Sequence, residues 1–316
     1  MDRQSSSIAV ALDHLTLPDT NAFERVGTVL DKAELGIERG MTVLVKPNLL
    51  LADSLACSDP LVVAAACAWL KDLGATVYVA DSPGFGTAKG VAQAIGLSQE
   101  LAKIGLTLSS LGRTVWMRAN VQDRCVRIPI AERALTCDRI LSVPRIKVHR
   151  QMLLSLAVKN CFGCIPGLHK AVVHTLYGAS RPFFAAYIAA LFDLLPPVAA
   201  LADGTVAMDC VGPSGGRLYP LGLIGASASA EALDHVLTGI LGVDQASVPL
   251  SCALVQRKAR QCQALDYTEP RRLFFPLESP EAWHVTHFRL PKLITTSFAP
   301  HRLLVSCIRR IFASHI

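Results

Sequence analysis

The sequence predicts an α/β protein with a largely parallel sheet flanked by helices. Short apolar runs of strand length alternate with segments of helical spacing from residue 8 to about residue 241. Such alternation favours parallel strands joined by helical crossovers. After about residue 255 proline-punctuated segments replace this pattern. We therefore expect an α/β domain over 1–255 and an irregular C-terminal extension over 256–316.

Local signals define the individual elements. Asp59 and Pro60 supply an N-cap and a first-turn proline, and Gly74 ends the same helix. Ser229 is expected to cap a later helix. Strands are expected at 8–12, 41–45, 75–80, 139–143, 198–202 and 221–226, with weaker alternating runs around 114–118 and 125–130. Helices are expected at 21–35, 60–73, 87–95, 183–195 and 230–241.

Composition limits the classes of protein. The chain has 316 residues, of which 51% are hydrophobic and only 18% charged, so a compact globular protein with a buried core is expected. The net charge of +6 suits a small anion or a membrane surface. Aromatic residues are only 6% and no Lys/Arg run marks a nucleic-acid groove, which argues against a nucleic-acid partner. The apolar run at 183–195 is shorter than the ~20 residues that a membrane span needs.

Polar and charged residues gather where the expected strands end. In open α/β sheets ligands bind at the carboxyl ends of the parallel strands, so residues at these ends are expected to share one cleft. These candidates for binding a substrate or carrying its chemistry are Lys46, Asn48, Asp81, Ser82, Lys147, His149 and Asp203.

The densest chemistry lies between residues 142 and 174. Lys147 and His149 are two positions apart, so in an extended segment both side chains point to one face. Gly163 breaks any helix that starts near Gln151, which places Lys159 at an exposed helix end or turn. Clustered cations lower the pKa of a lysine, and such a lysine can act as a base. We interpret the cluster as a proton-transfer set with an anion clamp; the alternative is a solvated basic face.

Five short blocks in this order resemble the DUF362 family, an uncharacterised group. The blocks are Val45-Lys46-Pro47-Asn48, Pro144-Arg145-Ile146-Lys147-Val148-His149, Val158-Lys159-Asn160-Cys161-Phe162-Gly163-Cys164-Ile165-Pro166-Gly167, Asp203-Gly204 and Gly212-Pro213-Ser214-Gly215. The resemblance covers roughly residues 40 to 245, and order over such a length is hard to obtain by chance. It implies a site that also includes Asn160 and His174. Many relatives append a ferredoxin-type cysteine motif, which this chain lacks.

The cysteines allow a second interpretation. The chain has ten, but its first seven residues lack the apolar core of a secretory signal, so a reducing, cytoplasmic location is expected. Cys161 and Cys164 alone have ligand-like spacing. They could hold a metal or an iron–sulfur cluster, which would make the protein a carrier. Packing around Gly163 is the favoured interpretation, because no second C-x-x-C occurs.

A distant similarity suggests a third interpretation. His149, Lys159 and His174 are ten and fifteen residues apart, which is similar to the His/Lys/His order around the tethered nickel-pincer cofactor of lactate racemases. In those enzymes lysine anchors the cofactor and the histidines handle substrate protons. The G-T-H-R motif of that family is not present here.

Together these observations predict a cytoplasmic enzyme, an oxidoreductase or isomerase, that acts on a small anionic substrate by redox or proton-transfer chemistry. A ferredoxin-like protein is the expected electron donor if the reaction is redox. Residues 300–316 have an apolar helical face flanked by arginines, which would suit peripheral contact with a membrane. A terminal helix docked on its own domain is the favoured alternative.

Overall fold

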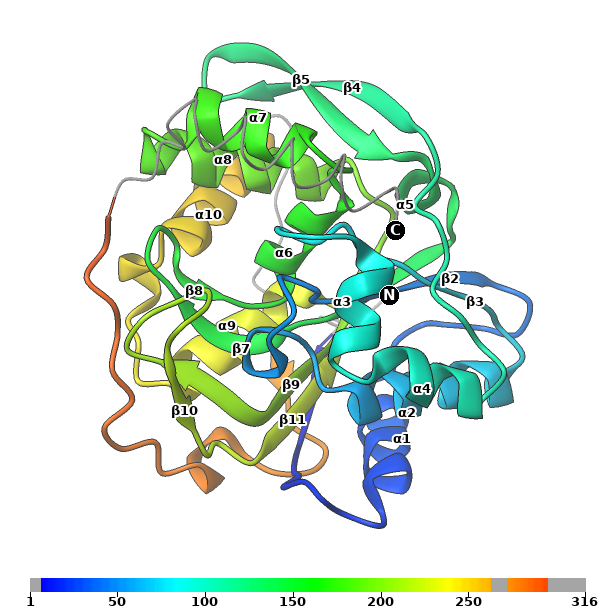
Figure 1. The fold of residues 1–316 in the computed structure, drawn as a ribbon. Helices are drawn as coiled ribbons and strands as arrows, with labels where there is room; N and C mark the ends of the chain where they lie inside the picture. Colours follow the sequence, from blue (N-terminus) through cyan, green and yellow to red (C-terminus); the bar gives the residue numbers. More distant parts are fainter. Residues whose placement is uncertain (1–6, 263–271, 295–316) are drawn as a thin grey trace, which may run out of the picture.

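The computed structural model describes residues 7–262 and 272–294. Its centre is a sheet in which β3 (Thr76–Val79), β2 (Thr42–Pro47), β6 (Arg139–Val143) and β9 (Val198–Asp209) lie side by side (Figure 1). These four strands are parallel, so their carboxyl ends meet at one edge of the sheet. The predicted α/β class with a mostly parallel, helix-flanked sheet is confirmed.

Beyond β9 the sheet changes direction. The next strand, β11 (Leu223–Ser227), is antiparallel to β9 and to β1 (Ile8–His14), and the short β12 (Leu273–Phe274) pairs with β1. A short strand, β10 (Arg217–Tyr219), pairs with the end of β9. The buried run at 221–226 was expected as a strand, and its antiparallel direction is a departure from the simple parallel pattern.

Two short strands carry the stretch that dominates the sequence. The first, β7 (Arg145–His149), is parallel to the far part of β9 and antiparallel to β8 (Leu153–Ser155). The extended backbone expected for Lys147 and His149 is therefore present. Where the sequence suggested a helix starting near Gln151, the chain forms β8, and only then the single turn α6 (Ala157–Asn160) and the 3₁₀ turn η2 (Cys161–Cys164).

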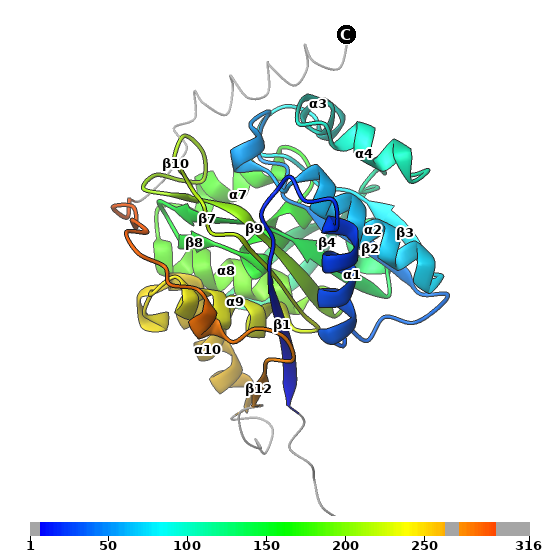
Figure 2. The same cartoon turned by 90° about the horizontal axis from the view of Figure 1, so that it is seen from below.

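Helices cover both faces of the sheet (Figure 2). Alternate strand residues explain why: Val43 and Val45 belong to one apolar core, and Leu44 between them belongs to the other. The Val43 face is covered by α1 (Ala22–Lys32), α2 (Pro60–Leu73), α3 (Ala88–Ala94) and α4 (Leu97–Lys103). The Leu44 face is covered by α6, α8 (Arg181–Asp193), α9 (Ala230–Ile240) and α10 (Pro249–Cys262), and α7 (His169–Tyr177) packs against α8.

Helix ends follow the signals read from the sequence. Asp59 accepts a hydrogen bond from the Leu61 N–H, and Gly74 closes α2 with a φ of 87°. Ser229 caps α9 by accepting from the Ala232 N–H. Two segments with weaker patterns gave no prediction, so α4 and α10 are helices that the sequence did not indicate. Helix α10 also crosses the boundary expected at residue 255. The division into domains stays a prediction.

The weakly alternating segment forms a long hairpin. In it β4 (Thr114–Val121) pairs antiparallel with β5 (Arg124–Ala131), and the short α5 (Glu132–Thr136) leads back to β6. The hairpin lies over α7 and α8 (Figure 1). No helix in the described part of the chain is long and apolar enough to cross a membrane. The expected contact through 300–316 falls outside the described residues.

Candidate functional site

A buried ion pair lies at the carboxyl ends of β2 and β3. Lys46 Nζ is 2.8 Å from Asp81 Oδ1, and the two side chains are only 1% and 2% exposed. The second oxygen of Asp81 accepts a hydrogen bond from the Leu49 N–H at 2.8 Å. Buried charges are tolerated when they are paired and hydrogen-bonded in this way. The pair therefore fixes the two loops that leave these strands.

Two asparagines extend this pair into a chain of hydrogen bonds. The Asn160 side-chain oxygen accepts from Lys46 Nζ at 3.2 Å and from the Asn48 amide at 2.9 Å. The Asn48 oxygen in turn accepts from Lys147 Nζ at 2.6 Å. Lys147 also donates to the carbonyl of Ala56. Five of the residues predicted for the site, from three strands and α6, are thus brought together.

Gly163 lies against this network. A Cβ atom at this position would be 2.3 Å from both Lys46 Nζ and Asp81 Oδ1. Such distances do not occur between non-bonded atoms, so only glycine allows η2 to pack here. The glycine explains why the turn after α6 covers the ion pair and excludes water from it.

Lys147 and Lys159 are buried lysines with no carboxylate partner among the described residues. Burial lowers the pKa of Lys147 to about 7. Burial likewise lowers the pKa of Lys159 to about 7, assisted by the nearby charges of Lys170, Lys147 and Lys46. The Lys159 ammonium lies 4.8 Å from the centre of the Phe162 ring, a cation–π contact. Both lysines can therefore exchange a proton near neutral pH.

The backbone fixes the form of His149. Its Nδ1 accepts hydrogen bonds from the N–H groups of Gln151 at 3.1 Å and Met152 at 3.2 Å. A nitrogen that accepts cannot carry the proton, so the neutral ring carries it on Nε2. Burial, with Lys159 and His174 nearby, holds the pKa of His149 well below its usual range. His149 can thus donate from Nε2 while uncharged.

His174, on α7, completes the group around Phe162. The two rings meet edge to face with 5.2 Å between centroids, and His174 also lies 4.6 Å from the Phe184 ring. Burial lowers the pKa of His174 to about 3. Lys159 and His174 thus contact the same aromatic ring, and their predicted joint role stays a prediction. Both histidines are neutral in this environment.

Ser82 links the site to α7 without touching the lysine network. Its hydroxyl accepts a hydrogen bond from the Gly167 N–H at 2.9 Å, and its carbonyl accepts from Lys170. The loop after β3 is thereby joined to the turn that starts α7. Ser82 holds two loops together, and its predicted role in substrate binding stays a prediction.

Asp203 lies apart from the lysines. Its Oδ1 pairs with Arg145 at 3.1 Å, and its Oδ2 accepts from the Asp59 N–H at 2.6 Å. Arg145 also donates to the Cys57 carbonyl at 2.7 Å. A cavity of about 400 Å³ opens beside this group and is lined by His14, Thr16, Leu17, Asp59, Thr205, Val206, Pro220, Leu221 and Gly222. Asp203 was expected at the end of a strand over 198–202, but β9 runs on to Asp209, so Asp203 lies inside the strand and outside the lysine network.

Asp234 is a positioning residue that sequence reasoning missed. From α9 its carboxylate accepts the N–H groups of Ala157 at 2.7 Å and Val158 at 3.0 Å, the first two residues of α6. It therefore holds the turn that carries Lys159 and Asn160. Burial raises the pKa of Asp234 to about 7. No local sequence signal joins residues this far apart in the chain.

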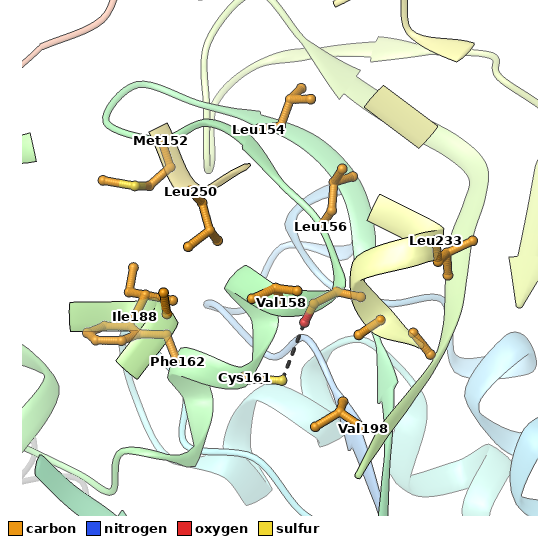
Figure 3. Packing of buried hydrophobic residues seen from close by; sticks show 14 of the residues in the cluster. Met152, Leu154, Leu156, Val158, Cys161, Phe162, Ile188, Val198, Leu233 and Leu250 are labelled. Carbon is orange, nitrogen blue, oxygen red and sulfur yellow. Dashed lines mark hydrogen bonds between the residues drawn. The ribbon is translucent and has the colours of Figure 1, made fainter. Parts of the chain in front are cut away.

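The two spaced cysteines lie in the apolar core, where Figure 3 shows Cys161 among its neighbours. Cys161 Sγ donates to the Ala157 carbonyl at 3.5 Å, and burial raises the pKa of Cys164 to about 12. A cysteine binds a metal as the thiolate, and this environment disfavours that form. Among the described residues no group of three or more His, Cys, Asp and Glu side chains could hold a metal ion. These residues therefore do not fit an iron–sulfur cluster, and the carrier interpretation gains no support.

Fold and site together define an α/β protein with a lysine-rich network buried at its parallel sheet edge. The model of a domain of unknown function, DUF362, matches residues 43–239, and the chain belongs to this family. It is 30% identical over 282 residues to a thylakoid-associated protein from Synechocystis, covering 87% of this chain and 84% of that protein. The lactate racemase apoprotein from Thermoanaerobacterium thermosaccharolyticum aligns with a TM-score of 0.47 at 11% identity, over 73% of this chain and 57% of that chain.

Proposed function

We propose that the protein is an enzyme that binds a small anion at the buried lysines and moves a proton to or from it. The observation that carries this proposal is the pair of buried cations, Lys147 and Lys159, without a described carboxylate partner. Asp81 is already paired with Lys46, and Asp203 with Arg145. The positive charge of a buried ammonium group is costly when no negative charge lies beside it. A bound anion would supply that negative charge.

The roles follow from the contacts of each group. Lys147 donates to two fixed oxygens, those of Asn48 and Ala56, so its nitrogen is held in one place. In its neutral form it keeps a lone pair that can accept a proton from the substrate. Lys159, facing the Phe162 ring, is assigned to hold the anion. His149 is assigned to donate a hydrogen bond from Nε2 to the oxygen on which charge develops.

The test combines binding with proton exchange. Inorganic phosphate and a panel of small 2-hydroxy and 2-oxo carboxylates would be titrated calorimetrically into wild type, Lys147→Met and Lys159→Met. Deuterium incorporation at carbon would be followed in heavy water by NMR. Lys103→Met is the matched control, because Lys103 is exposed on α4 and pairs with Glu100.

We expect Lys159→Met to lose anion binding and Lys147→Met to keep binding but lose exchange by 10²-fold or more, roughly the contribution of a general base. The control should behave like wild type. Unchanged binding and exchange in both site variants would reject the proposal.

A second candidate is a racemase-like enzyme in which Lys159 anchors a covalently tethered cofactor. The position of Lys159 favours this candidate. Its charge helps to lower the pKa of His149, and Lys159 and His174 both contact the Phe162 ring. A lysine that is neutral near pH 7 is a good nucleophile, as anchoring requires. Intact-mass analysis of protein purified from its own host would detect the added mass. A mass equal to that of the bare chain would reject this candidate.

We further propose that the protein works in the cytoplasm at the surface of a membrane. The support for the membrane is the thylakoid-associated relative and the net charge of +6. Fractionation of cells that express the full chain tests this location: recovery with membranes that salt washing can release is the expected result. Recovery only in the soluble fraction at low salt would contradict it.

A further inference from the structure

One side of α7 is apolar and exposed. Leu168, Val172 and Leu176 are 39%, 44% and 63% exposed, and their spacing of four places them on one helical face. The other face of the same helix carries the buried Val173 together with His174, next to the candidate site. Helix α7 is thus amphipathic, with its site residues inward and aliphatic side chains outward.

The outer face of the β4–β5 hairpin continues this surface. Trp116, 47% exposed, meets the His169 ring of α7 edge to face at 5.2 Å. Arg127 lies over the Trp116 ring at 5.0 Å and is directly opposite Arg118 across the two strands. Figure 1 shows the hairpin beside α7.

The two facing arginines have no acidic partner among the described residues. Like charges directly opposite each other destabilise a strand pair, and no described carboxylate pairs with either side chain. The surrounding sequence is equally one-sided. The hairpin, residues 114–131, contains three basic residues, Arg118, Arg124 and Arg127, against a single acidic one, Asp123. An anionic partner would relieve this repulsion.

We infer that Trp116, Arg118, Arg127, Leu168, Val172 and Leu176 form a docking surface for an anionic lipid bilayer, here called the α7–hairpin surface. The inference rests on the proposed membrane location and names the part of the molecule that makes the contact. Aliphatic side chains enter the boundary between headgroups and acyl chains, tryptophan prefers the same depth, and arginines reach lipid phosphates. A purely acidic partner, such as polyglutamate, would satisfy the arginines but would leave the outward aliphatic residues of α7 in water.

Docking in this orientation would bring the site close to the bilayer. Helix α7 separates the two, and a helix with its side chains is ~10–12 Å across. The inward side chains Lys170 and His174 would then lie within about one helix diameter of the headgroups. The surface involves a part of the chain far in sequence from residues 300–316.

The experiment measures vesicle binding by the full chain. Wild type would be mixed with vesicles of phosphatidylcholine alone and with vesicles containing equal parts of phosphatidylglycerol, and bound protein would be separated by flotation. The test variants are Arg118→Gln/Arg127→Gln and Val172→Ser/Leu176→Ser. The matched controls are Lys103→Gln, exposed on α4, and Phe23→Ser, 41% exposed on α1, which both lie on the opposite layer.

Wild type should bind the anionic vesicles and not the neutral ones. The arginine variant should bind about 30-fold more weakly, since each arginine near an anionic surface contributes ~1 kcal/mol. The serine variant should bind the anionic vesicles at least tenfold more weakly than wild type, and both controls should bind like wild type. If both test variants still bound vesicles like wild type, the proposed α7–hairpin surface would be wrong, while the proposed membrane location would stand. Failure of wild type to bind any vesicle, or binding to polyglutamate instead, would overturn both.

Discussion

Lys46 Nζ lies 2.8 Å from Asp81 Oδ1, and this pair is shut off from water by the backbone of Gly163. The pair joins two loops that leave neighbouring parallel strands, and Asn160 ties it to α6. This buried contact between the ends of β2 and β3 is therefore one of the anchors of the lysine-rich site.

Breaking the pair from one side should be costly. Asp81→Asn leaves the buried Lys46 ammonium without its counter-charge, so we expect the free energy of unfolding to fall by ~3–5 kcal/mol. The double variant Lys46→Met/Asp81→Leu removes both charges, so its free energy of unfolding should fall by less than that of the single variant. Urea denaturation followed by circular dichroism measures both. A loss below ~1 kcal/mol in Asp81→Asn would mean that the pair is not buried in solution.

Gly163 should not tolerate even one methyl group. Gly163→Ala places Cβ 2.3 Å from Lys46 Nζ and Asp81 Oδ1, so the turn must move away from the ion pair. Overpacking of this kind costs ~1–3 kcal/mol. Gly239→Ala on α9 is the control, because nothing lies within 4 Å of its added Cβ. It should stabilise the protein by ~0.4–1 kcal/mol. Equal thermal midpoints for the two variants would contradict the close approach at Gly163.

Much of this site follows from the order of elements alone. Lys46, Asn48, Asp81 and Lys147 each lie at or just after a strand, and parallel strands bring such ends together. The caps at Asp59 and Ser229 were readable for a similar reason, since a cap contacts only its own first turn. Proximity to a recognisable element end is what made these positions predictable.

Other features depend on contacts that no local pattern carries. A buried apolar run such as 223–227 looks the same whether it pairs parallel or antiparallel, so the direction of β11 was not predictable. Asp234 and Arg145 act through partners from distant segments, the amides of α6 and the carboxylate of Asp203. Asp203 was expected to follow the end of a strand, but β9 continues to Asp209, and the contact of Asp203 with Arg145 separates it from the lysines.

The carboxylate of Asp234 should make stability depend on pH below neutrality. Its pKa is raised to about 7 in the folded protein, from an ordinary value near 4, so the folded state binds the extra proton between these values. The stability contributed by this proton is complete below pH ~4 and is lost as pH rises to about 7. In Asp234→Asn this dependence should be absent, while one hydrogen bond to α6 is lost. Wild type should therefore exceed the variant most at low pH, in urea titrations from pH ~4 to 8. If instead the stability of wild type relative to the variant increased with pH, the hydrogen bonds from the α6 amides would be keeping the Asp234 carboxylate ionised.

Lys159 should produce the opposite dependence above neutrality. Its pKa is lowered to about 7 in the folded protein, whereas the unfolded chain keeps its lysines protonated up to the ordinary value near 10.4. Between these values the unfolded state binds more protons, so this lysine makes stability rise with pH by up to ~1.4 kcal/mol per unit. Replacement by Met keeps the stem against Phe162 and removes this dependence. The gain in stability of Lys159→Met over wild type should therefore be greatest at or below pH 7 and disappear toward pH ~10.

Anion binding should change with the same group, because it needs the charged form. Wild type should bind phosphate more weakly as pH rises through about 7, and Lys159→Met should show neither the binding nor its pH dependence. Lys103→Met, at an exposed position paired with Glu100, should match wild type in both measurements. Calorimetric titrations and urea denaturation at pH 6, 7.5 and 9, a range that spans this pKa, separate the two effects. If Lys159→Met were no more stable than wild type at the lowest pH and still bound phosphate, Lys159 would be an ordinary solvated lysine, and the site would reduce to Lys147 and His149.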